Sequence, residues 1–143
     1  LRPEFLILEL TENCWIPDIN LLNDKFISLK GIGVYIAIDD FGTGYSSLNY
    51  LKRLPIDKVK IDKSFVSDIG IDLKSEFIIE KVIELAHMLN LEVVAEGVET
   101  KNQLHYLEKI GCDIIQGYYV SKPLGFDKIV KSFTEDKTLV FDR

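Results

Sequence analysis

The sequence predicts an α/β fold in which about five βα units with parallel strands form part of a TIM-like barrel. Short aliphatic runs alternate with amphipathic helical segments, a pattern typical of parallel βαβ units. Polar residues end successive runs at positions 9, 39, 60, 96 and 116, four steps with a mean spacing of about 27 residues. An eight-unit barrel uses roughly 31 residues per unit, so the spacing fits this architecture.

The two faces of the predicted strands differ in polarity, which favours a barrel over the alternative, a doubly wound open sheet. Stepping by two along each strand gives one entirely aliphatic face: Leu6, Leu8, Val34, Ile36, Ile38, Val59, Ile61, Val93, Ala95 and Ile115. The other face mixes apolar and charged residues: Phe5, Ile7, Glu9, Tyr35, Ala37, Asp39, Lys58, Lys60, Asp62, Glu92, Val94, Glu96, Ile114 and Gln116. A doubly wound sheet normally needs two apolar faces, whereas a barrel needs one face under helices and one pointing inward.

The individual elements follow from caps, periodicity and breakers. Strands are predicted at 5–8, 34–38, 59–61, 93–95 and 114–115. Asp18 caps a helix that Gly31 stops, and Thr100 caps one that Gly111 stops. Between them, Ser46 or Ser47 caps a short helix closed by Pro55, and Ile78, Val82, Leu85 and Leu89 mark the longest helix. A last helix carries Phe126, Ile129, Val130 and Phe133, so we expect one domain over 1–134 and a tail over 135–143.

The composition narrows the possible functions. Among 143 residues the net charge is −6, which argues against binding long nucleic acid through its phosphates. The two cysteines, Cys14 and Cys112, are too few for a disulfide framework or a zinc site, and we expect them to pack in the core. No apolar run is long enough to cross a bilayer. We therefore expect a cytoplasmic location, or the cytoplasmic part of a membrane-bound protein.

The polar residues that end the runs predict a metal site at one rim of the barrel. Parallel strands bring their carboxyl ends together, so these residues converge: Glu9, Asp39, Asp40, Lys60, Glu96 and Gln116. Converging carboxylates raise one another's pKa unless a cation lies among them, and oxygen ligands suit Mg²⁺ or Mn²⁺. Adjacent aspartates share such a site only where the strand breaks, and Phe41 to Gly44 provides the expected break.

Each of these motifs also has a purely structural interpretation. The aspartate pair before Gly42 is typical of a turn or a helix cap, and Glu9 to Glu12 resembles a capping box. Gly42 and Gly44 resemble part of a dinucleotide-binding loop, but Ser47 stands where the third glycine belongs. Only the joint placement of polar groups on one rim favours a functional site.

Five segments together resemble the EAL domain family, cyclic-di-GMP phosphodiesterases with a TIM-like barrel. They occur in the family's order: ELTE (9–12), DDFGTGYSSL (39–48), LPIDKVKID (54–62), VVAEGVET (93–100) and QGYYVSKPL (116–124). The resemblance implies one or two Mg²⁺ or Mn²⁺ ions held by Glu9, Asp39, Asp40 and Glu96. It implies that Asp39 bridges the ions, that Lys60 orients the hydrolytic water and that Glu96 serves the second ion or acts as a base.

The resemblance also implies which residues contact the substrate and support the site. Gln116 would line the metal and substrate site, while Tyr118 and Pro123 would border a guanine. Phe41, Gly42, Thr43 and Gly44 would belong to a mobile loop that Glu12 anchors, and Glu99 would support Glu96. The Glu-Ala-Leu motif and an asparagine ligand of the family belong upstream of Leu1, so we expect the chain to be the C-terminal part of the domain, strands four to eight.

The implied activity is metal-dependent hydrolysis of cyclic-di-GMP to linear pGpG, weak or absent in this 143-residue chain alone. The alternative is a non-catalytic module that binds the same nucleotide. Members of the family often carry a diguanylate cyclase or sensory domain in the same chain, so the resemblance leaves such domains open for the parent chain. A five-stranded arc exposes strand edges and an apolar inner face with Phe5, Ile7, Tyr35, Val94 and Ile114, so we also expect a homodimer or other self-association.

Overall fold

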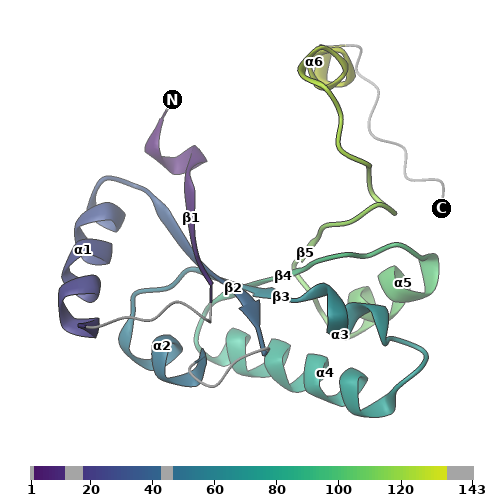
Figure 1. The fold of residues 1–143 in the computed structure, drawn as a ribbon, viewed down its shortest axis with the longest axis horizontal. Coiled ribbons are helices and arrows are strands. Elements are labelled where there is room, and N and C mark those ends of the chain that lie inside the picture. The colour runs from purple at the N-terminus through teal and green to yellow at the C-terminus, as the bar shows by residue number, and fades with distance from the viewer. Residues whose placement is uncertain (1, 12–17, 43–46, 135–143) are drawn as a thin grey trace.

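The strands form one parallel sheet that follows the chain order. The computed structural model describes residues 2–11, 18–42 and 47–134 (Figure 1). Its strands are β1 (Ile7–Thr11), β2 (Tyr35–Phe41), β3 (Lys58–Ile61), β4 (Glu92–Ala95) and β5 (Ile114–Ile115). They are hydrogen-bonded in the order β1-β2-β3-β4-β5, and every pairing is parallel. A sequential order is the progression of a barrel, so the prediction of an α/β barrel arc is confirmed.

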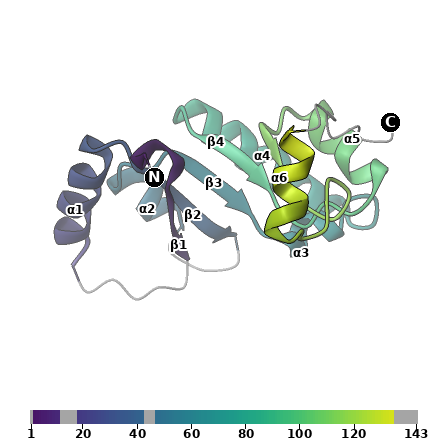
Figure 2. The same ribbon diagram turned by 90° about the horizontal axis from the view of Figure 1, so that it is seen from above.

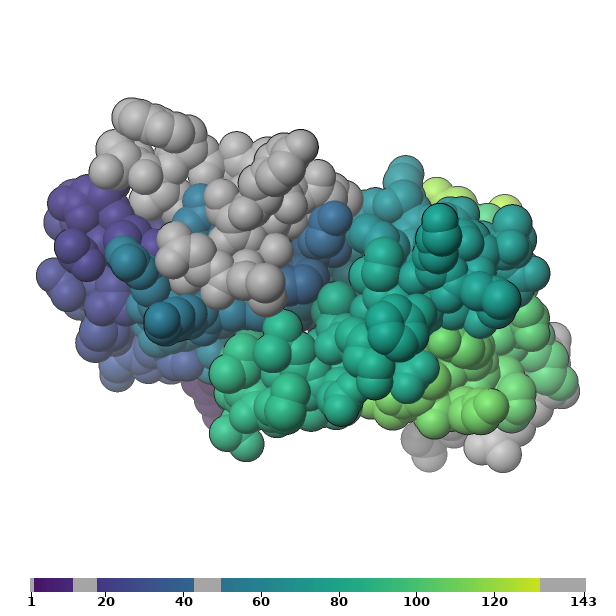
Figure 3. Space-filling model, turned by 90° about the horizontal axis from the view of Figure 1, so that it is seen from below, coloured from purple at the N-terminus to yellow at the C-terminus, as the bar shows by residue number. Residues whose placement is uncertain are grey.

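Helices that pack against the core cover one side of this sheet. The described helices are α1 (Ile19–Gly31), α2 (Ser47–Arg53), α3 (Lys63–Ser67), α4 (Leu73–Met88), α5 (Lys101–Lys109) and α6 (Phe126–Thr134). Figure 1 shows α2, α4 and α5 along one side of the strands, while α6 stands apart. In the space-filling view of that side, residues near 80 and 100 form a continuous cover (Figure 3).

The core lies between the sheet and these helices, as the aliphatic strand face predicts. Strand residues Ile36, Val59 and Val93 are fully buried, and they pack in one cluster with Phe26 of α1 and Ile83 of α4. On the opposite face, Val94 is 6% exposed, so the expectation that it is exposed is wrong. Val94 lies between Lys60 of β3 and Ile114 of β5 in the strand register, and these flanking strands account for its burial.

Several element boundaries differ from the prediction. The first strand begins at Ile7 instead of Phe5, because Pro3–Phe5 forms a 3₁₀ turn that the fixed φ of proline favours. The short helix α3 was not predicted; Asp62 caps it by accepting a hydrogen bond from the Ser64 N–H at 3.0 Å. Asp18 and Thr100 cap their helices as predicted, whereas Ser46, a predicted cap of α2, lies outside the described residues.

The buried face of α4 is rotated by about one residue from the predicted one. Ile79, Ile83 and Ala86 are buried, whereas Ile78 and Leu89 are 42% and 44% exposed. Adjacent isoleucines at 78 and 79 fit either register, so the periodicity alone did not determine which one faces the sheet. Cys112 packs against the core as predicted, and burial raises the pKa of its thiol to about 11.

An equivalent aspartate stands immediately before β3 and before β5. Asp57 accepts a hydrogen bond from the Ile36 N–H of β2 at 2.9 Å and pairs with Lys30, in the last turn of α1, at 2.5 Å. Asp113 accepts one from the Val93 N–H of β4 at 2.8 Å. Its other partner is His87, in the last turn of α4. Each aspartate therefore stands just before one strand and connects it to the second residue of the neighbouring strand and to the helix that precedes that neighbouring strand.

The predicted inner apolar face is present. Four of its five expected members are exposed: Phe5 at 65%, Ile7 at 46%, Tyr35 at 43% and Ile114 at 37%. A hollow of about 450 Å³ opens among side chains at the amino ends of the strands, lined by Glu4, Phe5, Ile7, Tyr35, Asp57, Lys58, Asn90 and Glu92. Within the described ranges, no helix has the length and apolar character needed to cross a bilayer.

The aspartate ties predict a pH-dependent contribution of Asp113 to stability. Burial raises the pKa of Asp113, but the His87 contact and the Val93 N–H lower it more, and the net pKa lies below its usual value. A carboxylate whose pKa is lowered by folding stabilises the fold at pH values above its unfolded-state pKa of about 3.9, and this stabilisation is lost as the pH falls through the folded-state pKa. We expect Asp113→Ala to lower the free energy of unfolding by about 1 kcal/mol at pH 7, measured by urea denaturation.

The difference between Asp113→Ala and the unaltered chain is expected to shrink when the same titration is run at pH 3. Asp24→Ala, at an exposed position of α1, is the matched control and should change neither midpoint. An Asp113→Ala deficit that stays constant down to pH 3 would contradict the proposed tie.

Candidate active site

The carboxyl ends of the first four strands bring one ammonium group into contact with three carboxylates. Lys60 Nζ, on β3, lies 2.8 Å from Glu9 Oε1 of β1 and 2.9 Å from Asp39 Oδ1 of β2. It also lies 2.8 Å from Glu96 Oε1, directly after β4. The predicted convergence of these side chains is therefore present in the structure.

Lys60 is held in its charged form by these contacts. The residue is 8% exposed. Burial lowers the pKa of the ammonium, but Glu9, Glu96 and Asp39 raise it more strongly, and the net pKa lies above its ordinary value. A lysine with a raised pKa does not serve as a base at neutral pH, so its chemistry is that of a fixed positive charge and hydrogen-bond donor.

An irregularity in β2 lets neighbouring aspartates share one site. The pairing of β2 with β3 shifts between Ile38 and Phe41, and Asp40 takes a left-handed conformation with φ of 54°. Alternation would otherwise send Asp39 and Asp40 to opposite faces. The break falls on Asp40 itself, one residue before the segment that the sequence indicated. The break explains how two adjacent carboxylates at the end of this strand can lie on the same side.

Three carboxylates gather closely enough to bind one cation. Ligand oxygens of Asp39, Asp40 and Glu96 lie within 4.8 Å of one another. Asp39 Oδ1 is buried and, although it lies close to Lys60, has no partner with hydrogen-bonding geometry among the described residues. Mg²⁺ and Mn²⁺ prefer hard oxygen ligands, and a group of carboxylates that includes a buried oxygen without a hydrogen-bond partner fits such an ion.

Electrostatic repulsion within the cluster acts on Asp40. Burial raises the pKa of Asp40, the charges of Asp39, Asp62 and Glu9 raise it further, and Lys60 opposes them. A divalent cation would relieve this repulsion. Asp62 was not selected from the sequence as a site residue, although its position two residues after Lys60 on the same strand face was an available signal.

The loop after β4 is fixed by close backbone contacts that position Glu96. A Cβ on Gly97, whose φ is 71°, would lie 2.5 Å from Lys63 Cβ. One on Gly117 would lie 2.2 Å from the Val98 carbonyl oxygen. Only glycine permits these approaches. The Gln116 backbone adds hydrogen bonds, donating to Ala95 O at 2.9 Å and accepting from Val98 N at 3.1 Å.

The remaining predicted site residues lie outside this cluster or outside the described residues. Phe41, expected in the loop, is the last residue of β2 and is buried in the core. Gly42 follows it, and a Cβ there would lie 2.9 Å from the Phe65 ring. Tyr118 is 58% exposed, with Lys122 over its ring. Pro123 and Glu99 are exposed, and the Glu99 N–H donates to the Gln103 side chain at 2.8 Å. Glu12, Thr43 and Gly44 lie in the ranges that the structure does not describe.

The described positions bear on two of the structural alternatives. Glu9 and Thr11 belong to β1, whereas Glu12 lies outside the described residues, so the capping-box interpretation of this segment stays a prediction. Asp39 and Asp40 belong to a strand and not to a helix cap.

A parallel βα arc with acidic groups and a lysine at its carboxyl rim defines a barrel domain with a candidate metal centre. The EAL domain family model matches residues 1–123, and the chain belongs to this family. The bifunctional diguanylate cyclase/cyclic di-GMP phosphodiesterase MucR of Pseudomonas aeruginosa is 42% identical over 92% of this chain. The signaling protein YkoW of Bacillus subtilis is 46% identical over 87%. The chain spans only 19% and 16% of these two proteins.

Solved structures of EAL domains share the fold. The EAL domain of Mycobacterium smegmatis DcpA matches with a TM-score of 0.86 at 41% identity, over 90% of this chain and 58% of that one. A MucR phosphodiesterase in complex with c-di-GMP gives a TM-score of 0.83 at 42% identity, over 90% of this chain and 52% of that one. A manganese and cyclic di-GMP complex of Klebsiella pneumoniae BlrP1 gives 0.78 at 37% identity, over 86% and 31%.

The charge balance of the cluster predicts an effect of removing its ammonium. Lys60→Met leaves three carboxylates without their counter-charge, and we expect the free energy of unfolding in EDTA to fall by about 2–3 kcal/mol. Millimolar Mn²⁺ should stabilise this variant more than the unaltered chain, because the ion replaces the missing positive charge. Urea denaturation in EDTA and in MnCl₂ measures both effects.

Lys109→Met, at an exposed position at the end of α5, is the control for removing a lysine. Equal losses in the two variants, or no extra stabilisation of Lys60→Met by Mn²⁺, would show that the ammonium does not balance the cluster.

Proposed function

We propose that this chain contributes to metal-dependent hydrolysis of cyclic-di-GMP, opening one phosphodiester bond to give linear pGpG. The observation that carries the proposal is the gathering of Asp39, Asp40 and Glu96 within 4.8 Å, beside the Lys60 ammonium. Support comes from relatives such as MucR, whose name includes cyclic di-GMP phosphodiesterase, and NbdA of Pseudomonas aeruginosa, a cyclic di-GMP phosphodiesterase that is 47% identical over 84% of this chain.

The proposed ligands for one or two Mg²⁺ or Mn²⁺ ions are Glu9, Asp39, Asp40 and Glu96. Bound divalent ions supply a water of lowered pKa and stabilise negative charge on phosphate oxygens. Asp39 is proposed to serve both ions; its carboxylate lies within 4.8 Å of those of Asp40 and Glu96, which supports a shared site. The manganese complex of BlrP1 supports the metal class and leaves the choice of ion to experiment.

Lys60 is proposed to orient the attacking water and to offset charge on the phosphate. Its raised pKa keeps the proton on Nζ, so it donates hydrogen bonds and accepts none. Glu96 is the candidate for holding the second ion or for accepting the water's proton. It follows β4, whereas Glu9 is on β1, so the two carboxylates approach Lys60 of β3 from opposite sides.

The substrate side of the site is proposed on the loop after β5. Gln116, exposed directly after β5, is proposed to line the metal and substrate site, and the exposed Tyr118 and Pro123 are proposed to border a guanine. The supporting roles of Glu12, Phe41, Gly42, Thr43, Gly44 and Glu99 stay predictions. So do the domain limits of 1–134 and a tail of 135–143.

The cellular setting is also proposed. The name of MucR includes a diguanylate cyclase, and DosP of Escherichia coli, 41% identical over 87% of this chain, is an oxygen sensor protein. These names support cyclase or sensory domains as neighbours of this domain. A cytoplasmic location remains our prediction, since cyclic-di-GMP is the proposed substrate.

Metal binding at the cluster gives a direct test. We expect the unaltered chain to bind Mn²⁺ in isothermal titration calorimetry and Asp40→Asn to weaken the affinity at least about tenfold, because a charged ligand is lost. Asp24→Asn, far from the cluster on α1, is the matched control and should bind as the unaltered chain does. Equal affinities in all three proteins would refute the proposed ligand set.

Product formation separates the enzyme from a nucleotide-binding module. In a longer chain that carries the family's Glu-Ala-Leu motif and asparagine ligand, we expect release of pGpG from cyclic-di-GMP with Mn²⁺. Asp40→Asn in that chain should reduce the release by at least about a hundredfold. Tight nucleotide binding with no product from the unaltered chain would favour the non-catalytic alternative.

A further inference from the structure

The short helix α3 lies directly beyond the carboxyl end of β3, the strand that carries Lys60 (Figures 1 and 2). Asp62 follows the last residue of β3 and caps this helix. In the sheet, β3 is paired with β2 on one side and with β4 on the other. The surroundings of α3 are therefore set by inner strands of the sheet and not by its outer edges.

The aromatic ring of Phe65, on α3, lies against the backbone that follows the aspartate pair. A Cβ on Gly42 would lie 2.9 Å from Cε2 and 3.1 Å from Cζ of this ring. Gly42 has a φ of 99° and stands two residues after Asp40. Only glycine permits so close an approach. The segment that leaves Asp40 therefore rests directly on the edge of the Phe65 ring.

The first residue of α3 makes the equivalent contact on the other side of Lys60. A Cβ on Gly97 would lie 2.5 Å from Cβ and 3.3 Å from Cα of Lys63. Gly97 comes immediately after Glu96, whose N–H donates to the Ile61 carbonyl at 3.2 Å. Helix α3 thus contacts the backbone next to two carboxylates of the acidic cluster, one carried by β2 and one by the loop after β4.

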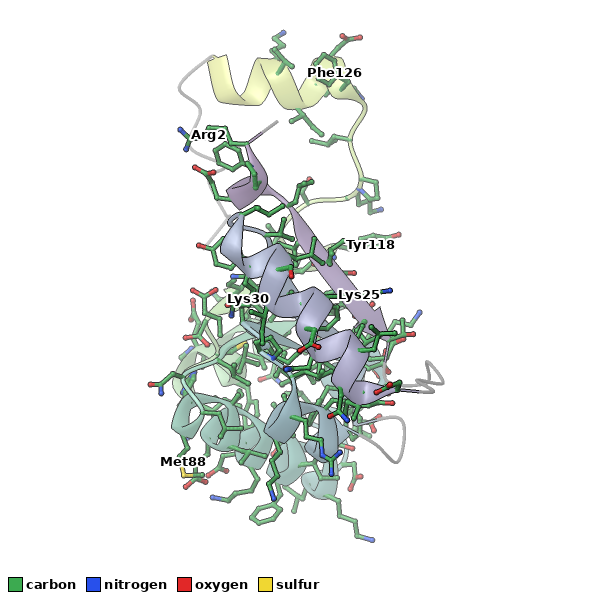
Figure 4. The ribbon with its side chains drawn as sticks, turned by 90° about the vertical axis from the view of Figure 1, so that its left-hand side faces the viewer. Arg2, Lys25, Lys30, Met88, Tyr118 and Phe126 are labelled. Atoms are coloured by element: carbon green, nitrogen blue, oxygen red, sulfur yellow. The ribbon has the colours of Figure 1, made fainter. Side chains whose placement is uncertain are left out.

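The ring that makes the contact with Gly42 is itself held in place. Phe65 packs against the hydrophobic core, and its neighbour Val66 is fully buried in that core. Figure 4 shows the contrasting case of Phe126, which stands away from the sheet on α6 and is 79% exposed. At the start of α3, the Ser64 N–H donates to the Asp62 side chain at 3.0 Å. The core and the cap together fix α3 relative to β3.

We propose that Phe65 is a positioning residue for the acidic cluster. Its ring fixes the backbone after Asp40, while Lys63 fixes the backbone after Glu96. Through these two contacts α3 sets the spacing between the two carboxylates, whose ligand oxygens lie within 4.8 Å of each other. The inference rests on the proposed function, because a bound divalent ion is what requires a set spacing of its ligands.

The affinity for Mn²⁺ tests the role of the ring. We expect Phe65→Ala to weaken Mn²⁺ binding at least about tenfold in isothermal titration calorimetry, the loss typical when a group that orients metal ligands is removed. Phe65→Leu keeps part of the apolar contact and should retain more of the affinity. Tyr106→Ala removes a half-buried aromatic side chain of α5, whose hydroxyl donates to the Glu76 carbonyl at 3.2 Å, and is the matched control. It should lower the urea midpoint yet bind Mn²⁺ as the unaltered chain does.

A double variant tests the contact itself. Gly42→Ala places a methyl group against the Phe65 ring and also strains a backbone with positive φ. In the Phe65→Ala background the collision is absent and only the strain remains. Gly42→Ala should therefore weaken Mn²⁺ binding less in that background than in the unaltered chain. Losses that simply add would overturn the proposal.

Circular dichroism checks that each variant is folded, and Phe65→Leu replaces Phe65→Ala in the double variant if the alanine variant does not fold. Equal Mn²⁺ affinities of the unaltered chain and Phe65→Ala would overturn this inference and leave the proposed function intact. So would an equal loss of affinity in Tyr106→Ala. Absence of Mn²⁺ binding by the unaltered chain would overturn the proposed metal site and this inference with it.

Discussion

The ammonium of Lys60 is the contact on which the site depends. Lys60 stands on β3, the middle strand of the five, and its charge contacts carboxylates from the strands on both sides. The backbone ladder sets the distance between strands, but the side chains at the rim would repel one another without this charge. The same contacts that raise its pKa keep Glu9, Asp39 and Glu96 directed at one volume.

Local backbone irregularities bring acidic side chains together in a way that regular strands cannot. The positive φ of Asp40 turns two sequence neighbours toward one site, and Gly97 and Gly117 allow the loop carrying Glu96 to pack against α3 and the loop after β5. Non-glycine residues in the left-handed region are uncommon and costly. The strained residue Asp40 therefore lies in the acidic cluster, where the binding of a cation would offset the cost of its backbone conformation.

Much of this was predictable from the sequence, and the misses have identifiable causes. The strand order and the convergence of Glu9, Asp39, Lys60 and Glu96 follow from the βα repeat and residue parity. The face of α4 was ambiguous because Ile78 and Ile79 are both apolar and only packing selects between them. Burial of Val94 depends on its neighbours across the sheet, and the break at Asp40 depends on the shifted pairing with β3, neither of which a single strand's pattern contains.

The paired aspartates Asp57 and Asp113 have a consequence for how this domain can diversify. They fasten neighbouring units at the amino ends of the strands, far along the strand axis from the acidic rim. The aspartate ties and the acidic cluster thus occupy opposite ends of the same sheet. Rim residues can therefore be replaced while the alignment of the strands is preserved, so the fold does not depend on the identity of the residues in the cluster.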